Sequence, residues 1–178
     1  MGRLLRRYHD VVAGYRPDPS VPFEEGPRDF RPGQIVGHGD IAPRNTVFRD
    51  GLPVAFIDWD GAWIADPLWD VGYAVWQFAP LVPDDTLRGL GWPGPPDRLA
   101  WAAALADGYG LDPAGRQALP GTTAPMIRLC AAEIAIKARA GQPAFARLMV
   151  AGVTADMARE ARYAAAQAPV LSRALLAG

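Results

Sequence analysis

Apolar residues recur at the spacing of amphipathic helices in two parts of the chain, near the N-terminus and beyond Trp63. Asp66-Pro67 and Asp112-Pro113 each place a capping carboxylate before a proline that suits the first helical position. Gly110 and Gly141 mark helix ends. The pattern therefore predicts helices over residues 2–14, 66–79, 98–109, 124–140 and 143–166, and a loop over residues 90–97.

Between the first two helices the apolar residues come in short runs separated by turn residues. The predicted strands are residues 34–37, 45–49 and 53–57, and an extended connector with five prolines precedes them over residues 15–32. Asp50-Gly51 favours a tight hairpin between the last two strands. The run Val54–Ile57 has the composition of a buried strand. We therefore predict an α+β fold, mostly α-helical, with a small β-hairpin in its N-terminal third.

Length and composition favour a globular protein with its own core. A chain of 178 residues has the size of one domain, and 50% of its residues are hydrophobic. A formal net charge of −1 argues against a partner bound through nucleic-acid phosphates. No apolar run approaches the roughly 18 residues of a membrane span, and no apolar signal core follows residues 1–7. With Cys130 as the only cysteine, no internal disulfide is possible, so we predict a cytoplasmic protein without membrane or nucleic-acid partners.

Three polar residues, Asp40, Asn45 and Asp58, stand out because their neighbours are apolar. Asp58 follows the run Val54–Ile57, and a carboxylate at the end of a buried strand is costly to desolvate unless a cation or hydrogen bonds meet it. The predicted hairpin returns the chain beside itself, which places Asn45 and Asp58 on one side of a single metal ion. Oxygen ligands of this kind suit Mg²⁺, which usually takes one or two carboxylates together with substrate phosphates.

Two motifs in this segment resemble those of known phosphoryl-transfer enzymes. His38-Gly39-Asp40, four residues and then Asn45 has the spacing of the protein-kinase catalytic loop, H-R-D-x-x-x-x-N, with glycine in place of arginine. Ile57-Asp58-Trp59-Asp60 stands where kinases carry the metal-binding D-F-G aspartate, and the run Asp66–Asp70 follows it. In this form the segment resembles the aminoglycoside phosphotransferase and choline kinase-like family, whose members phosphorylate small-molecule hydroxyl groups on a protein-kinase-like fold.

The resemblance implies a role for each matched residue. Asp40 would be the catalytic base that accepts the proton of the substrate hydroxyl, with Asn45 beside it in the catalytic set. Asn45 and Asp58 would hold Mg²⁺ against the phosphates of ATP or GTP. Asp60 would assist the metal or orient its loop, and His38 would brace the catalytic loop, so both belong to the implied cofactor site. The implied partner is a small molecule that carries a hydroxyl group.

The same comparison implies the C-terminal lobe of such an enzyme and no N-terminal nucleotide lobe. Only 39 residues precede Asp40, and they contain neither a lysine nor a strand-rich pattern. We predict a single domain over residues 1–178, with the catalytic segment at about 34–70 and a helical substrate region at about 71–178. Such a domain would expose an apolar lobe-facing surface, so self-association or a partner that supplies the missing lobe is expected.

Two other functions stay open. Loss of the nucleotide lobe would leave a non-catalytic remnant or an interaction module. A metal-dependent hydrolase using Asp40 and Asp58 is a weaker alternative, because two-metal sites need more ligands than this chain readily provides.

The remaining candidates are interpreted structurally. His9 is assigned to the scaffold or the solvent, and Cys130 to the apolar interior. Asp70 either hydrogen-bonds the catalytic loop or lies at the surface. Four tryptophans are assigned to the core and the cleft wall: Trp59, Trp63, Trp69 and Trp76. Five acidic residues are interpreted as solvent-exposed: Asp84, Asp85, Asp97, Asp107 and Glu133.

Overall fold

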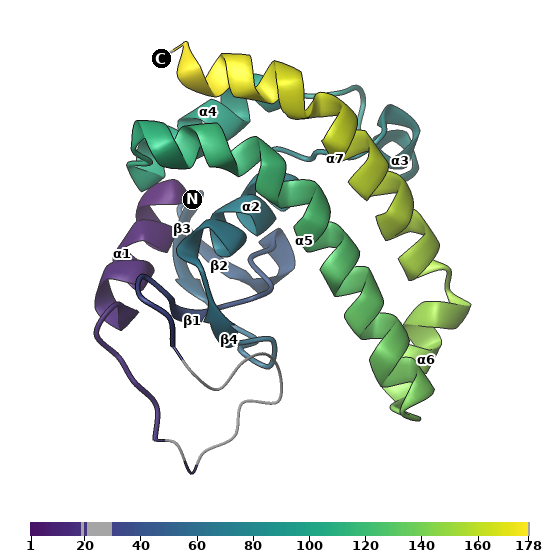
Figure 1. Cartoon of the computed structure of the whole chain (residues 1–178). Coiled ribbons are helices and arrows are strands. Elements are labelled where there is room, and N and C mark those ends of the chain that lie inside the picture. Colours follow the sequence, from purple (N-terminus) through teal and green to yellow (C-terminus); the bar gives the residue numbers. More distant parts are fainter. Residues whose placement is uncertain (19, 21–29, 178) are drawn as a thin grey trace.

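The computed structural model describes residues 1–18, 20 and 30–177, and most of them are helical. Figure 1 shows the strands and α1 gathered around α2, with long helices crossing above them. The strands are β1 (Ile35–Gly37), β2 (Thr46–Arg49), β3 (Leu52–Phe56) and β4 (Trp63–Ala65). The helices are α1 (Gly2–Val12), α2 (Pro67–Phe78), α3 (Asp84–Gly89), α4 (Arg98–Tyr109), α5 (Pro113–Arg139), α6 (Pro143–Val150) and α7 (Val153–Leu176), with a 3-10 turn at Pro43–Asn45. The described residues thus confirm a mostly helical α+β chain, while part of the predicted connector, residues 19 and 21–29, lies outside them.

The strands form two small antiparallel pairs. β2 pairs with β3, and the turn residues Asp50 and Gly51 both have positive φ angles, 51° and 73°, as a two-residue hairpin turn requires. This confirms the predicted hairpin. β1 pairs with β4, a strand over Trp63–Ala65 that the sequence pattern did not predict, since it indicated only the helix that begins at Asp66. The short run is a strand because β1, far away in the sequence, supplies its hydrogen bonds.

The hairpin lies at the surface, which corrects the interpretation of Val54–Ile57 as a buried strand. Leu52 is 64% exposed and Ile57 is 49% exposed, whereas Phe56 is buried. The residues of the exposed apolar hairpin are Val47, Phe48, Leu52, Val54 and Ile57. The composition of these strands is apolar, but the described part of the chain does not cover them.

The predicted helix bounds hold best where caps are strong. α4 matches its prediction, and Gly110 ends it in the left-handed conformation. α5 begins at the Asp112 cap rather than near residue 124, and it runs through Pro120 and Pro125 without ending. Prolines weaken a helix by removing hydrogen bonds. Here packing against α2 and α7 outweighs that loss, because α5 buries a stripe of apolar side chains there.

The predicted single helix over residues 143–166 is two helices. Gly152 takes a left-handed φ of 80° between α6 and α7, and α7 then continues to Leu176 through Pro169. α3 was not predicted, because its six residues are too short to show a helical period.

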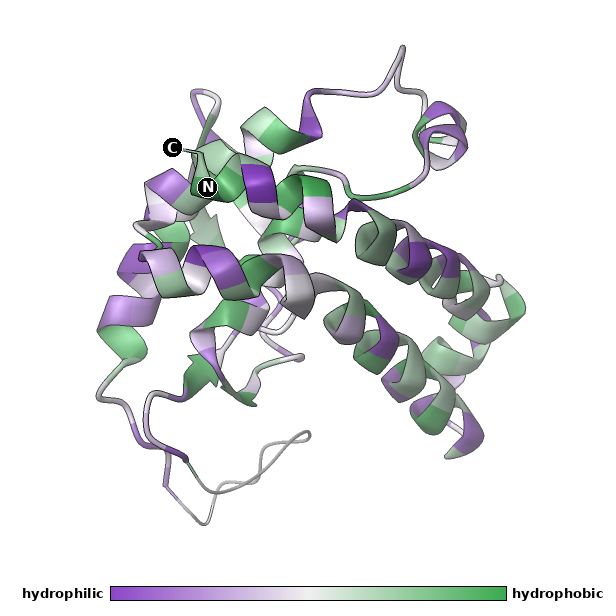
Figure 2. Cartoon of the chain, turned by 45° about the horizontal axis from the view of Figure 1, so that its top comes forward, coloured by the Kyte–Doolittle hydropathy of each residue, from purple (hydrophilic) through white to green (hydrophobic). Residues whose placement is uncertain are grey.

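The core is centred on α2, in which every residue from Asp70 to Trp76 is buried. α1, α4 and α5 pack around it, and α7 packs along α5. Beyond the core, α5, α6 and the start of α7 form a helical arm (residues 128–160) that projects from the body of the molecule (Figure 1). Hydrophilic and hydrophobic residues alternate along both long helices of this arm (Figure 2). No helix in the described part of the chain is long and apolar enough to span a membrane.

Thr123 on α5 is a local defect in this core, because its buried hydroxyl has no hydrogen-bond partner among the described residues. Replacing it by valine keeps the shape and removes the unpaired polar atom. We expect Thr123→Val to raise the free energy of unfolding by about 1 kcal/mol, measured by urea denaturation.

Thr46→Val is the matched control. Thr46 is also buried, but its hydroxyl donates to the Ala42 carbonyl at 2.9 Å. Its replacement is expected to lower the free energy of unfolding by about 1 kcal/mol. Equal losses in both variants would show that the Thr123 hydroxyl is paired in solution.

Candidate active site

The loop between β1 and β2 carries Asp40, and the loop between β3 and β4 carries Asp58 and Asp60. The backbones of the two loops contact each other at Gly39 and Gly61. Gly39 has a left-handed φ of 78°, and a Cβ at this position would lie 2.1 Å from the Gly61 carbonyl oxygen. No side chain fits in that space. Glycine replaces the kinase arginine at position 39 because the loops approach each other through their backbones.

The Asp40 carboxylate is held by side chains on three sides. Arg44 contacts Oδ1 at 2.5 Å, and the Asn45 amide nitrogen donates to Oδ2 at 2.7 Å and to the Asp40 carbonyl at 3.0 Å. The Tyr73 hydroxyl also lies beside it: burial, and then the charge of Asp40, raise the pKa of Tyr73 well above its usual value. Tyr73 therefore remains a hydrogen-bond donor at neutral pH. These contacts fix the orientation of a carboxylate that is still 28% exposed.

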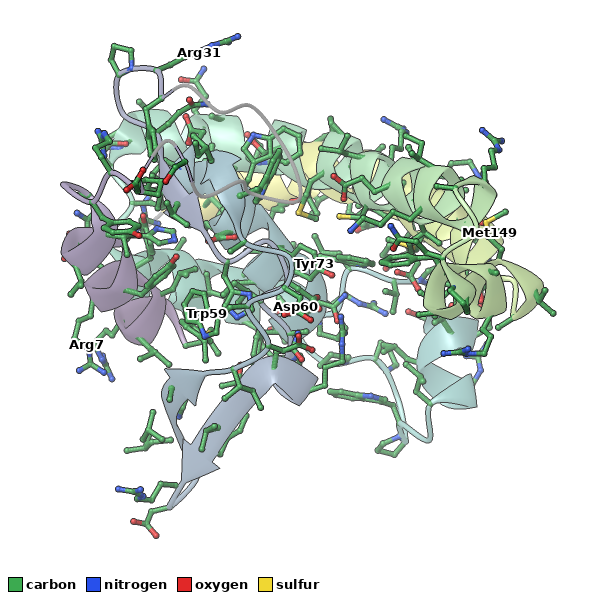
Figure 3. All side chains as sticks on the ribbon, turned by 90° about the horizontal axis from the view of Figure 1, so that it is seen from below. Arg7, Arg31, Trp59, Asp60, Tyr73 and Met149 are labelled. Atoms are coloured by element: carbon green, nitrogen blue, oxygen red, sulfur yellow. The ribbon has the colours of Figure 1, made fainter. Side chains whose placement is uncertain are left out.

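Asp58 and Asp60 face the same cavity as Asp40. The cavity measures about 350 Å³, and Asp40, Asp58 and Asp60 all line it. Asp58 has a φ of 64°, a left-handed conformation that aspartate and asparagine adopt more readily than most residues. Figure 3 shows Asp60 and Tyr73 together near the centre of the molecule, between the hairpin and the helical arm. The fold thus brings together the carboxylates of the two motifs.

His38 braces the loop from inside. It is fully buried, its Nε2 donates to the Ile57 carbonyl at 3.1 Å, and its Nδ1 accepts from the Asp40 amide at 3.3 Å. Its ring lies 4.4 Å from that of Trp59. Both nitrogens are engaged within the scaffold, so His38 links the two loops without facing the cavity.

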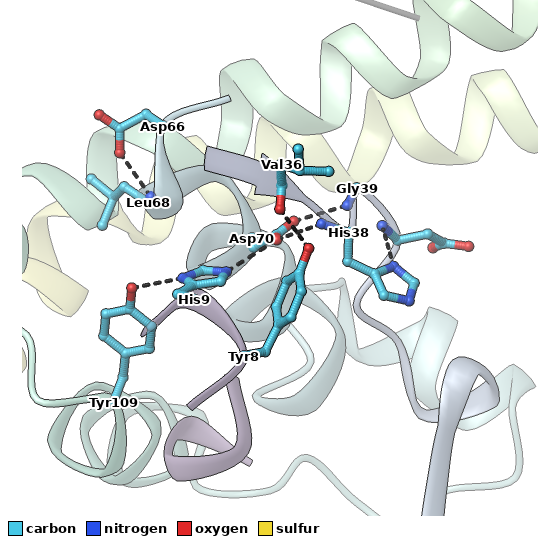
Figure 4. A network of polar contacts seen from close by, with 10 residues as sticks. Tyr8, His9, Val36, His38, Gly39, Asp66, Leu68, Asp70 and Tyr109 are labelled. Carbon is cyan, nitrogen blue, oxygen red and sulfur yellow. Dashed lines mark hydrogen bonds and ion pairs between the residues drawn. The ribbon is translucent and has the colours of Figure 1, made fainter. Parts of the chain in front are cut away.

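Asp70 on α2 also holds the loop between β1 and β2. The carboxylate is 2% exposed and accepts the backbone amide of His38 at 2.7 Å and that of Gly39 at 2.9 Å. Gly37 leaves room for it, since a Cβ there would lie 3.1 Å from Oδ2. The sequence left open whether Asp70 hydrogen-bonds this loop or lies at the surface. In the structure it hydrogen-bonds the loop (Figure 4).

The far wall of the cavity comes from the helical arm. Its residues are Cys130, Glu133, Ile134 and Lys137 on α5, Phe145 and Leu148 on α6, and Met157 on α7. Glu133 is partly buried and lines the cavity, so its interpretation as a solvent-exposed charge is wrong, and burial raises its pKa. The other four acidic residues of that group are exposed. Lys137 lies 4.7 Å from the centre of the Phe145 ring. Cys130 is partly buried against the core and also lines the cavity, which corrects its assignment to the interior alone, and burial raises its pKa to about 12.

Sequence reasoning found the two loops but missed part of their surroundings. Asn45 is buried behind Asp40, which it holds through its amide nitrogen. Arg44 and Tyr73 were not singled out, although Arg44 stands four residues after Asp40 and Tyr73 three residues after Asp70. Glu133 reaches the cavity from a distant helix, and no sequence signal indicated that contact.

The oxygen donors of these loops suit a divalent cation shared with a phosphate ligand. Within the described residues, no three His, Cys, Asp or Glu side chains are grouped so that they could hold a metal alone. Asp58 and Asp60 supply hard oxygen ligands at the cavity, whereas Asn45 is buried and is not among the residues that line it. Mg²⁺ accepts such a partial set, because it usually completes its octahedron with water and substrate phosphates.

Asp40 in one loop and the carboxylates of a second loop thus line one cavity, and protein kinases carry their catalytic-loop and metal-binding aspartates in two such loops. The chain belongs to the phosphotransferase enzyme family, whose sequence profile matches residues 24–120, more than half of the chain. It is also similar to the trifolitoxin immunity protein of Rhizobium leguminosarum bv. trifolii, with 36% identity over 112 residues. That match covers 62% of this chain and 43% of the relative, so the chain spans less than half the length of this curated protein. No solved structure matches it.

Proposed function

We propose that this chain is the catalytic lobe of a small-molecule kinase. It would transfer the γ-phosphoryl group of ATP or GTP to a hydroxyl group of a small molecule bound in the cavity. The observation that carries the proposal is that Asp40, Asp58 and Asp60, from the two family motifs, line one cavity. Membership of the phosphotransferase enzyme family supports the reaction class.

Each residue has a defined task in this reaction. Asp40 accepts the proton of the substrate hydroxyl as that oxygen attacks the γ-phosphorus. Asn45 and Tyr73 keep the carboxylate pointed at the cavity. Asp58, with Asp60 and Asn45, would hold Mg²⁺, which neutralises phosphate charge when bound. Phosphoryl transfer depends mainly on such positioning and charge stabilisation.

The nucleotide base and the substrate need further surfaces. We assign this chain to the C-terminal lobe of a protein-kinase-like fold, on the basis of its family and its two motifs. The exposed apolar hairpin would be the surface against which a nucleotide lobe packs. We place the protein in the cytoplasm, where ATP is available.

A second candidate function is favoured by the similarity to an immunity protein. In that case the chain would be a binding module that uses the cavity and the hairpin to capture a ligand without phosphorylating it. The two functions differ in their need for nucleotide, which a binding experiment measures directly.

The test is calorimetric titration of the purified chain with ATP, with and without Mg²⁺. We expect binding that requires Mg²⁺ and weakens by about tenfold or more in Asp58→Asn, because a metal ligand has lost its charge. Asparagine is the right replacement, since it tolerates the left-handed backbone at position 58.

Asp50→Asn is the matched control. Asp50 is the other non-glycine residue with positive φ in the described part of the chain, and it lies at the far end of the hairpin. Its replacement should leave ATP binding unchanged. No Mg²⁺-dependent binding at millimolar ATP would contradict catalysis by this chain alone and favour the binding module.

A further inference from the structure

Helix α1 presents two adjacent side chains to different parts of the site (Figure 4). Tyr8 and His9 are consecutive, and consecutive side chains on an α-helix point about 100° apart. His9 is 3% exposed, and Tyr8 is half-buried. The two residues therefore contact different neighbours from one rigid element.

His9 connects two helices through its ring nitrogens. Nδ1 lies 2.7 Å from the Tyr109 hydroxyl on α4, and Nε2 lies 3.2 Å from Oδ2 of Asp70 on α2. A carboxylate has no proton to give, so Nε2 carries the hydrogen and donates it. His9 is thus a hydrogen-bond donor to the residue that holds the catalytic loop.

The donor matters because Asp70 is almost fully buried. Its two oxygens accept the amides of His38 and Gly39 as well as the His9 ring, three N–H groups in all. A buried carboxylate is stable only when such donors replace water. Loss of one donor would leave Asp70 free to turn toward other partners, and the two loop amides would lose their fixed acceptor.

Tyr8 reaches the other loop. Its hydroxyl donates to the Val36 carbonyl in β1, and its ring lies edge-on to Trp59, with centroids 5.0 Å apart. Trp59 stands between Asp58 and Asp60 in the sequence, so its position affects both carboxylates. The neighbouring residue on α1 therefore supports the metal-binding loop.

We infer that His9 is a positioning residue for the catalytic loop, acting through Asp70, and that Tyr8 supports the Asp58–Asp60 loop through Trp59. Helix α1 therefore fixes the positions of both loops, although neither Tyr8 nor His9 lines the cavity. The inference rests on the proposed function only where it calls these loops catalytic and metal-binding. The hydrogen bonds themselves can be tested without any activity.

The test compares amide hydrogen exchange at Gly39 with that at Val75, measured by NMR. Val75 lies in the fully buried part of α2 and serves as an internal reference for overall stability. In His9→Phe an aromatic ring is kept, although a larger one, and both ring nitrogens are lost. We expect the exchange rate of Gly39 to rise about tenfold or more relative to Val75.

Two further variants separate positioning from packing. His9→Gln places an amide N–H near the former Nε2 and should restore most of the Gly39 protection. Leu5→Ala removes a fully buried side chain from the same helix without touching the polar contacts, and should change Gly39 and Val75 together. The inference would be overturned if the ratio of the Gly39 exchange rate to the Val75 exchange rate stayed at its wild-type value in His9→Phe. It would also be overturned if Leu5→Ala raised this ratio as much as His9→Phe does.

Two measurements keep the result independent of folding and of catalysis. If His9→Phe does not fold, the inference is tested on the wild type by a long-range ¹⁵N–¹H spectrum, which shows which ring nitrogen of His9 carries a hydrogen. A His9 ring without a hydrogen on Nε2 would overturn the inference. In an active wild type, His9→Phe should lower kcat while KM for ATP changes little. A wild type without transferase activity contradicts the proposed function, and the exchange ratio still decides the role of His9.

Discussion

Asp40→Asn is expected to reduce phosphoryl transfer by about 10² to 10⁴-fold, the usual contribution of a general base. The variant keeps the size of the side chain and an oxygen that can accept from Arg44 or Asn45. Binding of ATP with Mg²⁺ should therefore change little, and the loss should appear in kcat. The measurement is steady-state transfer with each candidate hydroxyl substrate, paired with calorimetry on the same protein.

Asp10→Asn is the matched control for Asp40. Asp10 also forms an ion pair with an arginine four positions away, Arg6, but it lies on α1 and does not line the cavity. Its replacement removes the same charge and the same kind of surface pair, which contributes little to stability. Wild-type kcat in Asp40→Asn, or an equal loss in Asp10→Asn, would show that Asp40 is not the base.

The motif residues could be predicted from sequence because their spacing is local. The hairpin at Asp50-Gly51 fixes how the chain returns, so Asn45 and the segment that leads to Asp58 come together once β2 and β3 pair, and the Ile57 amide donates to the Asn45 carbonyl. The Asp66-Pro67 cap likewise fixed the start of α2 and hence the position of Asp70. These features depend on a few neighbouring residues, and pattern reasoning describes such residues well.

The elements and site residues that the sequence did not predict depend on contacts between segments far apart in the chain. Trp63–Ala65 is a strand only because β1 pairs with it. Glu133 lines the cavity because α5 lies beside the loops, and its sequence neighbours do not reveal this. The continuity of α5 through Pro120 and Pro125 depends on its packing against α2 and α7. In each case tertiary contacts outweighed the local preference.

The scaffold of the site is built largely from backbone groups. Two loop amides bind Asp70, the Ile57 carbonyl accepts from His38, and the loops meet where Gly39 faces the Gly61 carbonyl. Such contacts leave little freedom for side chains to compensate. The positions that tolerate no substitution should therefore include residues without any chemistry of their own.

Gly39→Ala is expected to be the most damaging single change to this scaffold. The added Cβ would lie 2.1 Å from the Gly61 carbonyl oxygen, which is rigid backbone, and φ is 78° at this position. The two loops must separate, so the carboxylates that line the cavity lose their arrangement. We expect the free energy of unfolding to fall by about 2 to 5 kcal/mol, measured by urea denaturation, with loss of Mg²⁺-dependent ATP binding.

Gly51→Ala separates the contact from the backbone strain. Gly51 has a similar φ of 73°, but a Cβ there meets nothing within 4 Å. This variant should lose only about 1 kcal/mol, the usual cost of a left-handed conformation for alanine, and should keep ATP binding. If Gly39→Ala were no worse than Gly51→Ala, the loops could not be touching at Gly61. The close approach of the two motifs would then have to be abandoned as the basis of the site.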